Sequence, residues 1–519
     1  MQNKSGFLYI MNLTAIMKFS NNYESYFYFL AWSCAISYSV YEFYLSNNYF
    51  DNYYDAYNDF DRGWTWIGKK RDISDQEWRA WLALVNKLIS YIFIHHFFSQ
   101  IIKVNSNNMI LCCWYILSST AFLYYYIGLL GALCALLQPS LLHIITYKYS
   151  KNVAWLIHVS FLFVIHILKI PNGIFQSWLG FDDEQHYILT LTMCWIHLRS
   201  ISHNMDSIDD KLLNSNNFIQ KLAYCLYLPT LFSGPLILYH EFVESINQPH
   251  QYWNYQKLQT FVLNLIRYMF WLYFTELLLH FIYVNAIQYH PQIVQNLNPW
   301  ALYGLGYCMG QFFLNKYVVI YGISKTLCNL DNVKAPPPPK CIARIHLYSD
   351  MWKHFDRGLY KFLINLFIFS RYIYIPVQKS NGCFGKLFAS FLCFAFVLIW
   401  HGIQVNIFIW SLFNFIGIAI ESIGVSIGKS KQYHKMQNMY LSPKNIKRFH
   451  CILASPLLAM SAISNFYFFG GPLIGNIFTY NIILYGSWKT LFILFFFLYC
   501  CCQVSVDVKN WELKVRSLT

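Results

Sequence analysis

The chain has 519 residues, of which 56% are hydrophobic and only 12% are charged, and its mean hydropathy is +0.33. Soluble domains carry about 25% charged residues, so the composition excludes an ordinary soluble enzyme and indicates a membrane protein with many crossings. The net charge of +14 lies largely in short loops, which the positive-inside rule explains better than nucleic-acid binding does. The sequence therefore predicts contact with membrane lipid and no nucleic-acid partner.

A series of apolar stretches approaches or exceeds the ~20 residues that a crossing helix needs. In chain order they are Tyr26–Leu45, Trp81–Ile102, Met109–Leu137, Val153–Ile170, Tyr187–Ile201, Ala223–Tyr239, Phe261–Tyr283, Trp300–Ile323, Phe384–Ile403, Val405–Ile427, Cys451–Phe469 and Ile482–Cys502. Some are short or contain proline. We predict a single-domain, all-α polytopic membrane protein with about ten transmembrane helices plus re-entrant or amphipathic helices around a central tunnel. The first crossing is expected to act as a signal anchor, because Met1–Ser20 lacks a small-residue cleavage site.

Three basic segments are predicted to face the cytosol. Lys429–His450 contains six lysines and arginines and no acid, and the C-terminus carries Lys509, Lys514 and Arg516. The third segment is Lys325–Arg344. By contrast, the aspartate-rich stretch Asp51–Asp61 is expected on the lumenal side.

Two segments do not fit a simple crossing. Tyr227–Pro235 holds two prolines and a glycine in an apolar setting, so some of its backbone groups need partners outside a helix. Arg344–Val377 mixes charges with bulky apolar residues, which is typical of amphipathic or re-entrant helices that line an internal cavity.

His401 is the most informative single residue. From Leu387 to Ile420 the chain carries no full charge, and as a helix this run would extend about 50 Å. It is therefore one long tilted helix or two helices that meet near Gly402, with His401 at membrane depth. An ionisable side chain there indicates function: a general base, a proton relay or a metal or haem ligand, with a packed structural histidine as the alternative. No second histidine follows at i+4, which argues against a zinc helix motif, and the absence of G-x-S-x-G argues against the usual hydrolase route.

A carboxylate could support such a histidine. Asp356, in the segment Met351–Leu359, is the best candidate: it would orient His401 or the substrate. The alternative for Asp356 is an interfacial salt bridge with Arg357 or Lys353.

These residues belong to a longer pattern. Met351-Trp352, Phe355-Asp356, Gly358-Leu359, Arg371–Pro376 and Trp400-His401-Gly402 together resemble the membrane-bound O-acyltransferase superfamily, most closely its Hedgehog acyltransferase branch. The resemblance runs nearly end to end, because counterparts continue in order from Tyr41-Glu42 to Gly470-Gly471. An aspartate at 356 also favours this branch, since the superfamily more often has asparagine there.

The resemblance implies residue roles. His401 matches the catalytic histidine and Asp356 the second essential polar residue. Trp352, Arg371 and Asn465 align with residues around the acyl-CoA site, and Cys341 matches a cysteine that ligates haem b iron. In one departure from the family, Asn365–Ser370 is interposed between Ile364 and Arg371, where six extra residues would rotate a helix by most of two turns.

The implied function is transfer of palmitate from palmitoyl-CoA to the N-terminal cysteine of a Hedgehog-type secreted protein, in the endoplasmic reticulum membrane. The first alternative is a related acyltransferase that acts on a serine hydroxyl of a Wnt-like protein or on a lipid hydroxyl. The second is a transporter or an inactive relative, although transporters often show internal repeats, of which we find none, and an inactive relative would be expected to lose His401.

Overall fold

The computed structural model describes residues 23–50, 58–104, 108–146, 149–209, 218–249, 252–341, 344–366 and 383–518. Within these ranges nearly all regular structure is helical. The strands are β1 (Phe60–Asp61) and β2 (Arg71–Asp72), which pair antiparallel with Phe60 opposite Asp72. The predicted all-α class is confirmed.

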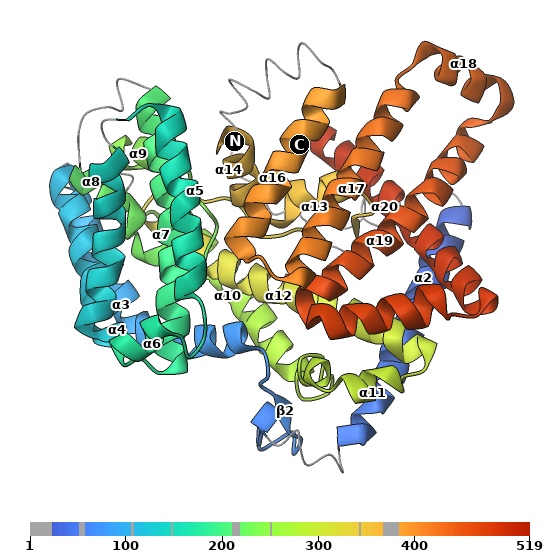
Figure 1. Ribbon diagram of the computed structural model, residues 1–519, viewed down its shortest axis with the longest axis horizontal. Coiled ribbons are helices and arrows are strands. Elements are labelled where there is room, and N and C mark those ends of the chain that lie inside the picture. Colours follow the sequence, from blue (N-terminus) through green and yellow to red (C-terminus); the bar gives the residue numbers. More distant parts are fainter. Residues whose placement is uncertain are drawn as a thin grey trace.

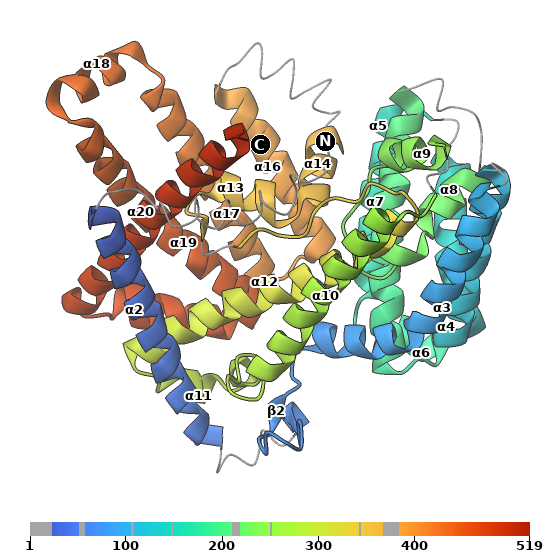
Figure 2. The ribbon, with the colours of Figure 1, turned by 180° about the vertical axis from the view of Figure 1, so that it is seen from behind.

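The helices form two lobes joined by two crossing helices (Figures 1 and 2). The first lobe contains α3 (Gln76–Val104), α4 (Asn108–Thr146), α5 (Lys151–Leu168), α6 (Ile174–Leu179), α7 (Asp183–Asp209), α8 (Phe218–Cys225) and α9 (Tyr239–Asn247). The second contains α2 (Tyr23–Leu45), α11 (Pro291–Gln295), α13 (Tyr348–Phe355), α14 (Arg357–Leu366), α16 (Cys383–His401), α17 (Val405–Gly428), α18 (Lys431–Tyr440), α19 (Pro443–Phe478) and α20 (Trp488–Leu518). Between the lobes run α10 (Tyr255–Leu278) and α12 (Pro299–Leu330). Single turns lie at Ser46–Phe50, Leu228–Thr230, Ala286–Tyr289 and Thr479–Leu484.

Six of the described helices are long and apolar enough to cross a membrane. They lie at Gln76–Val104, Asn108–Thr146, Tyr255–Leu278, Val405–Gly428, Pro443–Leu484 and Trp488–Val515, and two shorter apolar helices cover Asn152–Leu168 and Gly385–His401. Each coincides with a predicted crossing. The predicted crossing Ala223–Tyr239 is not a helix over its length: after α8 the chain makes one turn at Leu228–Thr230 and then runs extended.

Buried side chains replace the helix bonds that this broken segment lacks. The Arg199 guanidinium, fully inside the first lobe, donates to the carbonyl oxygen of Cys225 at 2.9 Å and to the carbonyl of Thr230. Unpaired carbonyls in an apolar interior are costly, so Arg199 makes the interruption tolerable. The expectation that these backbone groups need outside partners is confirmed.

The charge-free run around His401 consists of two helices. α16 ends at His401, Gly402 takes a φ of 137°, and α17 begins at Val405. A positive φ is open to glycine at little cost, so Gly402 allows the chain to turn directly after the histidine.

Two of the basic segments that were expected on one face of the membrane pair with α20, which carries the third. Lys447 pairs with Asp507 at 2.6 Å and Lys509 with Asp350 at 2.6 Å. Lys340 and Arg344 both pair with Glu512, at 3.1 and 2.8 Å. The segments therefore lie at one end of the second lobe.

Candidate active site

A cavity of about 450 Å³ lies around the middle of α12, between the second lobe and the adjoining part of the first. It is lined by side chains of α2, α12, α13, α16, α17, α19 and α20, with a few from α3 and α7, and its wall is mostly apolar and rich in aromatic rings. His401, Asp356, Trp352 and Asn465 all reach this cavity. Residues from three separate parts of the sequence therefore share one space.

The His401 ring is enclosed by three aromatic rings. Its centroid lies 4.6 Å from Trp400, 5.4 Å from Trp410 and 5.3 Å from Phe468, each in a near-perpendicular arrangement. The side chain is partly buried and lines the cavity. Within the described residues no protein group forms a hydrogen bond with its ring nitrogens. A ring held by packing alone, with its nitrogens free, can accept a proton from a bound substrate.

Asp356 occupies the junction between α13 and α14. Its Oδ1 accepts a hydrogen bond from the Leu359 amide at 2.8 Å, so the side chain caps the N-terminus of α14. Its Oδ2 accepts from the Tyr321 hydroxyl at 2.8 Å. The alternative of a salt bridge with Arg357 or Lys353 is wrong, because neither described side chain pairs with it.

No hydrogen bond joins Asp356 to His401 in the part of the chain that the structure describes. Of the two uses predicted for Asp356, direct orientation of the histidine ring is therefore not observed. Orientation of a substrate in the shared cavity stays a prediction.

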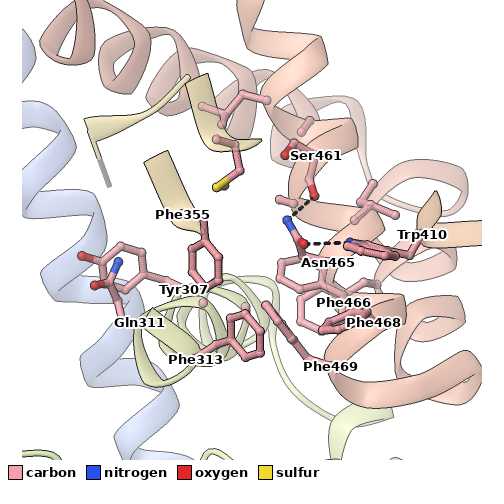
Figure 3. Close-up of a pocket in the computed structure, with 18 of the residues that line it drawn as sticks. Tyr307, Gln311, Phe313, Phe355, Trp410, Ser461, Asn465, Phe466, Phe468 and Phe469 are labelled. Atoms are coloured by element: carbon pink, nitrogen blue, oxygen red, sulfur yellow. Dashed lines mark hydrogen bonds between the residues drawn. The ribbon is translucent and has the colours of Figure 1, made fainter. Parts of the chain in front are cut away.

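A series of hydrogen bonds connects polar groups in the cavity wall beside His401. Trp352 Nε1 donates to Asn414 Oδ1 at 2.9 Å, and Asn414 Nδ2 donates to the Trp410 carbonyl at 2.8 Å. Figure 3 shows its continuation: Trp410 Nε1 donates to Asn465 Oδ1 at 3.2 Å, and Asn465 Nδ2 donates to the Ser461 carbonyl at 2.9 Å. These bonds fix the two tryptophans that flank the histidine side of the cavity.

Phenylalanine rings form another part of the wall (Figure 3). Phe313 stacks on Phe355 with centroids 5.3 Å apart, and Phe469 lies 4.6 Å from Phe313. A wall of this kind suits an acyl chain, since apolar contact is its main source of binding energy.

The sequence prediction missed a buried charge cluster at the edge of the cavity. Lys316 on α12 is 4% exposed and pairs with Asp75 at 3.0 Å and Glu77 at 2.8 Å. Glu77 also accepts from the Tyr317 hydroxyl at 3.0 Å and lines the cavity. The sequence contains one signal for this cluster, a lysine inside the apolar stretch Trp300–Ile323. An ionisable residue within a predicted crossing indicates a special site, as it did for His401.

Tyr321, Trp410 and Asn414 were also missed as members of the site. They are uncharged residues in apolar helices, and their roles depend on tertiary contacts. Tyr317 and Tyr321, four residues apart on α12, do share one helix face, which is a weak signal for a common surface.

Two predicted residues are not among those that the structure places at the cavity. Cys341 is a free, partly exposed cysteine just before α13 and is not part of the cavity lining. Arg371 lies outside the described residues, as does most of Asn365–Ser370. Their predicted roles therefore stay predictions.

Known proteins resemble this chain over large parts of its length. The pattern of the membrane-bound O-acyltransferase (MBOAT) family matches residues 10–464. The chain is 32% identical to the protein-cysteine N-palmitoyltransferase Rasp of Drosophila melanogaster over 64% of this chain and 65% of Rasp. It is 27% identical to the protein-cysteine N-palmitoyltransferase HHAT of Mus musculus, over 85% of this chain and 88% of the mouse protein. A mouse HHAT-like protein is 24% identical over 69% of this chain and 70% of its own length.

Proposed function

Because this chain belongs to the membrane-bound O-acyltransferase family, we propose that it is a protein-cysteine N-palmitoyltransferase. It transfers palmitate from palmitoyl-CoA to the N-terminal cysteine of a Hedgehog-type secreted protein, in the endoplasmic reticulum membrane. The observation that carries the proposal is the meeting of His401 and Asp356 at one aromatic-lined cavity. The match to HHAT over most of both chains supports the choice of acceptor.

In this mechanism the amine nitrogen of the acceptor attacks the thioester carbonyl carbon of the donor. His401 takes the proton from that nitrogen, the carbon–sulfur bond breaks, and the proton passes to the departing CoA thiolate. The product is an amide, formed directly or through a thioester on the cysteine followed by an S-to-N shift. Asp356, held by Tyr321 and the Leu359 amide, presents its remaining lone pairs to the substrate.

The aromatic wall supplies the second requirement of this reaction. An acyl chain that lies against Phe313, Phe355 and Phe469 is kept from water, and the same wall keeps water from competing with the amine for the thioester. Trp352 and Asn465 hold the wall near the histidine through their hydrogen bonds. Arg371 is proposed as a further contact to acyl-CoA on the strength of the family resemblance.

Haem b on Cys341 is a separate proposal. A free, partly exposed thiol can ligate iron once deprotonated, so the residue type fits the group. No step above passes through haem, and an absorption spectrum of the purified protein tests for it.

The decisive experiment is acyl transfer in reconstituted membranes to a peptide that begins with cysteine. We expect His401→Ala to lower turnover at least ~100-fold, a typical loss on removal of a general base. The matched control is His197→Gln, which alters another buried histidine outside the cavity and should leave turnover unchanged. Equal palmitoylation by His401→Ala and the wild type would remove this residue from the mechanism.

The same assay separates the acceptors. A peptide with a blocked amine should receive no stable amide, and a serine-containing Wnt-like peptide or a lipid alcohol should not compete. Preferred transfer to a hydroxyl would reassign the enzyme to another branch of the family.

A further inference from the structure

A second cluster of chemically active side chains lies in the first lobe, away from the cavity. His95 and His96 are neighbours on α3, and Asp331 is the first residue after α12. Their exposed fractions are 0%, 6% and 0%. One nitrogen from each histidine and one carboxylate oxygen lie within 4.8 Å of one another. This combination of types and burial is that of a closed metal site.

The contacts within the cluster are short. His95 Nε2 lies 3.3 Å from Asp331 Oδ2, and His96 Nδ1 lies 3.2 Å from Asp331 Oδ1. Even so, His95 Nε2, His96 Nδ1 and Asp331 Oδ1 are buried without any hydrogen-bond partner. Buried polar atoms are normally satisfied, so three such atoms converging in one place indicate a missing shared partner.

The surroundings of His95 suit a cation as that partner. Its Nδ1 lies 2.8 Å from the oxygen of the Ser118 hydroxyl, and that hydroxyl also contacts the Tyr115 carbonyl. In the tautomer that carries its proton on Nδ1, the lone pair of Nε2 faces the Asp331 carboxylate. Two electron-rich atoms at this distance repel unless a positive ion lies between them. A histidine that donates its other nitrogen to a neighbour is also the usual arrangement of a metal ligand.

The spacing matches a small tetrahedral ion. Zinc bonds to histidine nitrogen and carboxylate oxygen at about 2.0–2.1 Å, which places neighbouring ligands of a tetrahedron about 3.3 Å apart. Each histidine nitrogen lies near this separation from a different oxygen of Asp331, at 3.3 Å from Oδ2 for His95 and 3.2 Å from Oδ1 for His96. Tyr227 donates to Asp331 Oδ2 at 2.8 Å and orients the carboxylate, and the buried Tyr115 hydroxyl has no hydrogen-bond partner.

We propose that His95, His96 and Asp331 bind one zinc-class divalent cation as a structural site. The ion would join α3 to the end of α12, the helix that carries Tyr321 to the catalytic cavity. It takes no part in the acyl-transfer chemistry. Ion pairs between protonated histidines and Asp331 are the competing arrangement, and they predict a chain without bound metal.

The test begins with the full-length protein, purified in mild detergent with any polyhistidine tag removed. We expect about one zinc per chain by mass spectrometry of the metals. After chelation, cobalt(II) should restore about one equivalent and give the strong visible absorption of a tetrahedral complex. A wild-type chain that carries no zinc and gives no such spectrum overturns the proposal.

Variants place the ion. His96→Gln and Asp331→Asn should each lower metal content at least about tenfold, whereas His197→Gln, which changes a histidine of equal burial, should keep it. His401→Ala should also retain zinc, which separates this site from the catalytic cavity. Full metal content in His96→Gln and Asp331→Asn would show that the ion lies elsewhere and would overturn the assignment. If either variant does not fold, the cobalt spectrum of the wild type still decides.

Discussion

Addition of a single methyl group at Gly358 is expected to displace Asp356 and so to impair the site. It lies two residues after Asp356, in the first turn of α14, where that helix meets the extended segment after Pro235. A methyl group added at Gly358 would lie 2.4 Å from the Leu236 carbonyl oxygen and 2.8 Å from its amide nitrogen. Both are backbone atoms of a fully buried residue, so they cannot turn aside as a flexible side chain could.

The magnitude follows from this distance. Ordinary contact begins near 3.4 Å, so Gly358→Ala requires α14 to move by about 1 Å, and overpacking of this kind costs about 1–3 kcal/mol. Asp356 caps the same helix and must move with it. A shift of about 1 Å near reacting groups can lower a rate about 100-fold. We therefore expect a lower melting temperature together with a strong loss of turnover.

Turnover of the cysteine peptide and thermal unfolding in detergent measure the two effects. Gly424→Ala is the matched control: it lies on α17 with nothing within 4 Å of the added methyl group, and alanine should stabilise that helix by about 0.5–1 kcal/mol. If Gly358→Ala matched the wild type in both measurements, the packing of α14 against Leu236 could not be what positions Asp356.

Other substitutions separate the roles of neighbouring groups. Asp356→Asn keeps a good helix cap but removes the charge, so melting should stay near the wild-type value while turnover falls at least about tenfold; equal turnover would make Asp356 purely structural. Tyr321→Phe removes a hydrogen bond to a charged group, worth about 1.5–3 kcal/mol, and should lower turnover without loss of folded protein. Lys316→Met leaves Asp75 and Glu77 without their cation and should lower the free energy of unfolding by about 3–5 kcal/mol. The loss should appear as a poor yield or a lower melting temperature, and Lys316→Arg should restore part of the stability.

The sequence predicts the helices of this protein well because membrane crossing depends on local composition. The stretch Val405–Ile427 lies inside α17, and Met109–Leu137 lies inside α4, which has a kink at Gly128. His401 could be found for a similar reason, since an ionisable residue in an apolar run is conspicuous wherever its partners are.

The partners themselves could not be found in this way. Trp410 and Asn414 acquire their roles only when α17 packs against α13 and α19. The His95, His96 and Asp331 cluster needs α3 and the end of α12 to meet across more than 200 residues of chain. Asp356 shows the same limit: its position in the motif could be recognised, but its two hydrogen-bond donors depend on how α14 begins and where α12 runs.

The end of α16 bears on how substrates can reach the histidine. The Trp400 carbonyl, one residue before the helix stops, accepts a hydrogen bond from Lys169 at 2.9 Å, and Lys169 follows α5 in the other lobe. Separation of the two lobes at this point would break this hydrogen bond between the Lys169 ammonium and the Trp400 carbonyl. The contact therefore favours substrate routes that leave the lobes together and pass through gaps between helices.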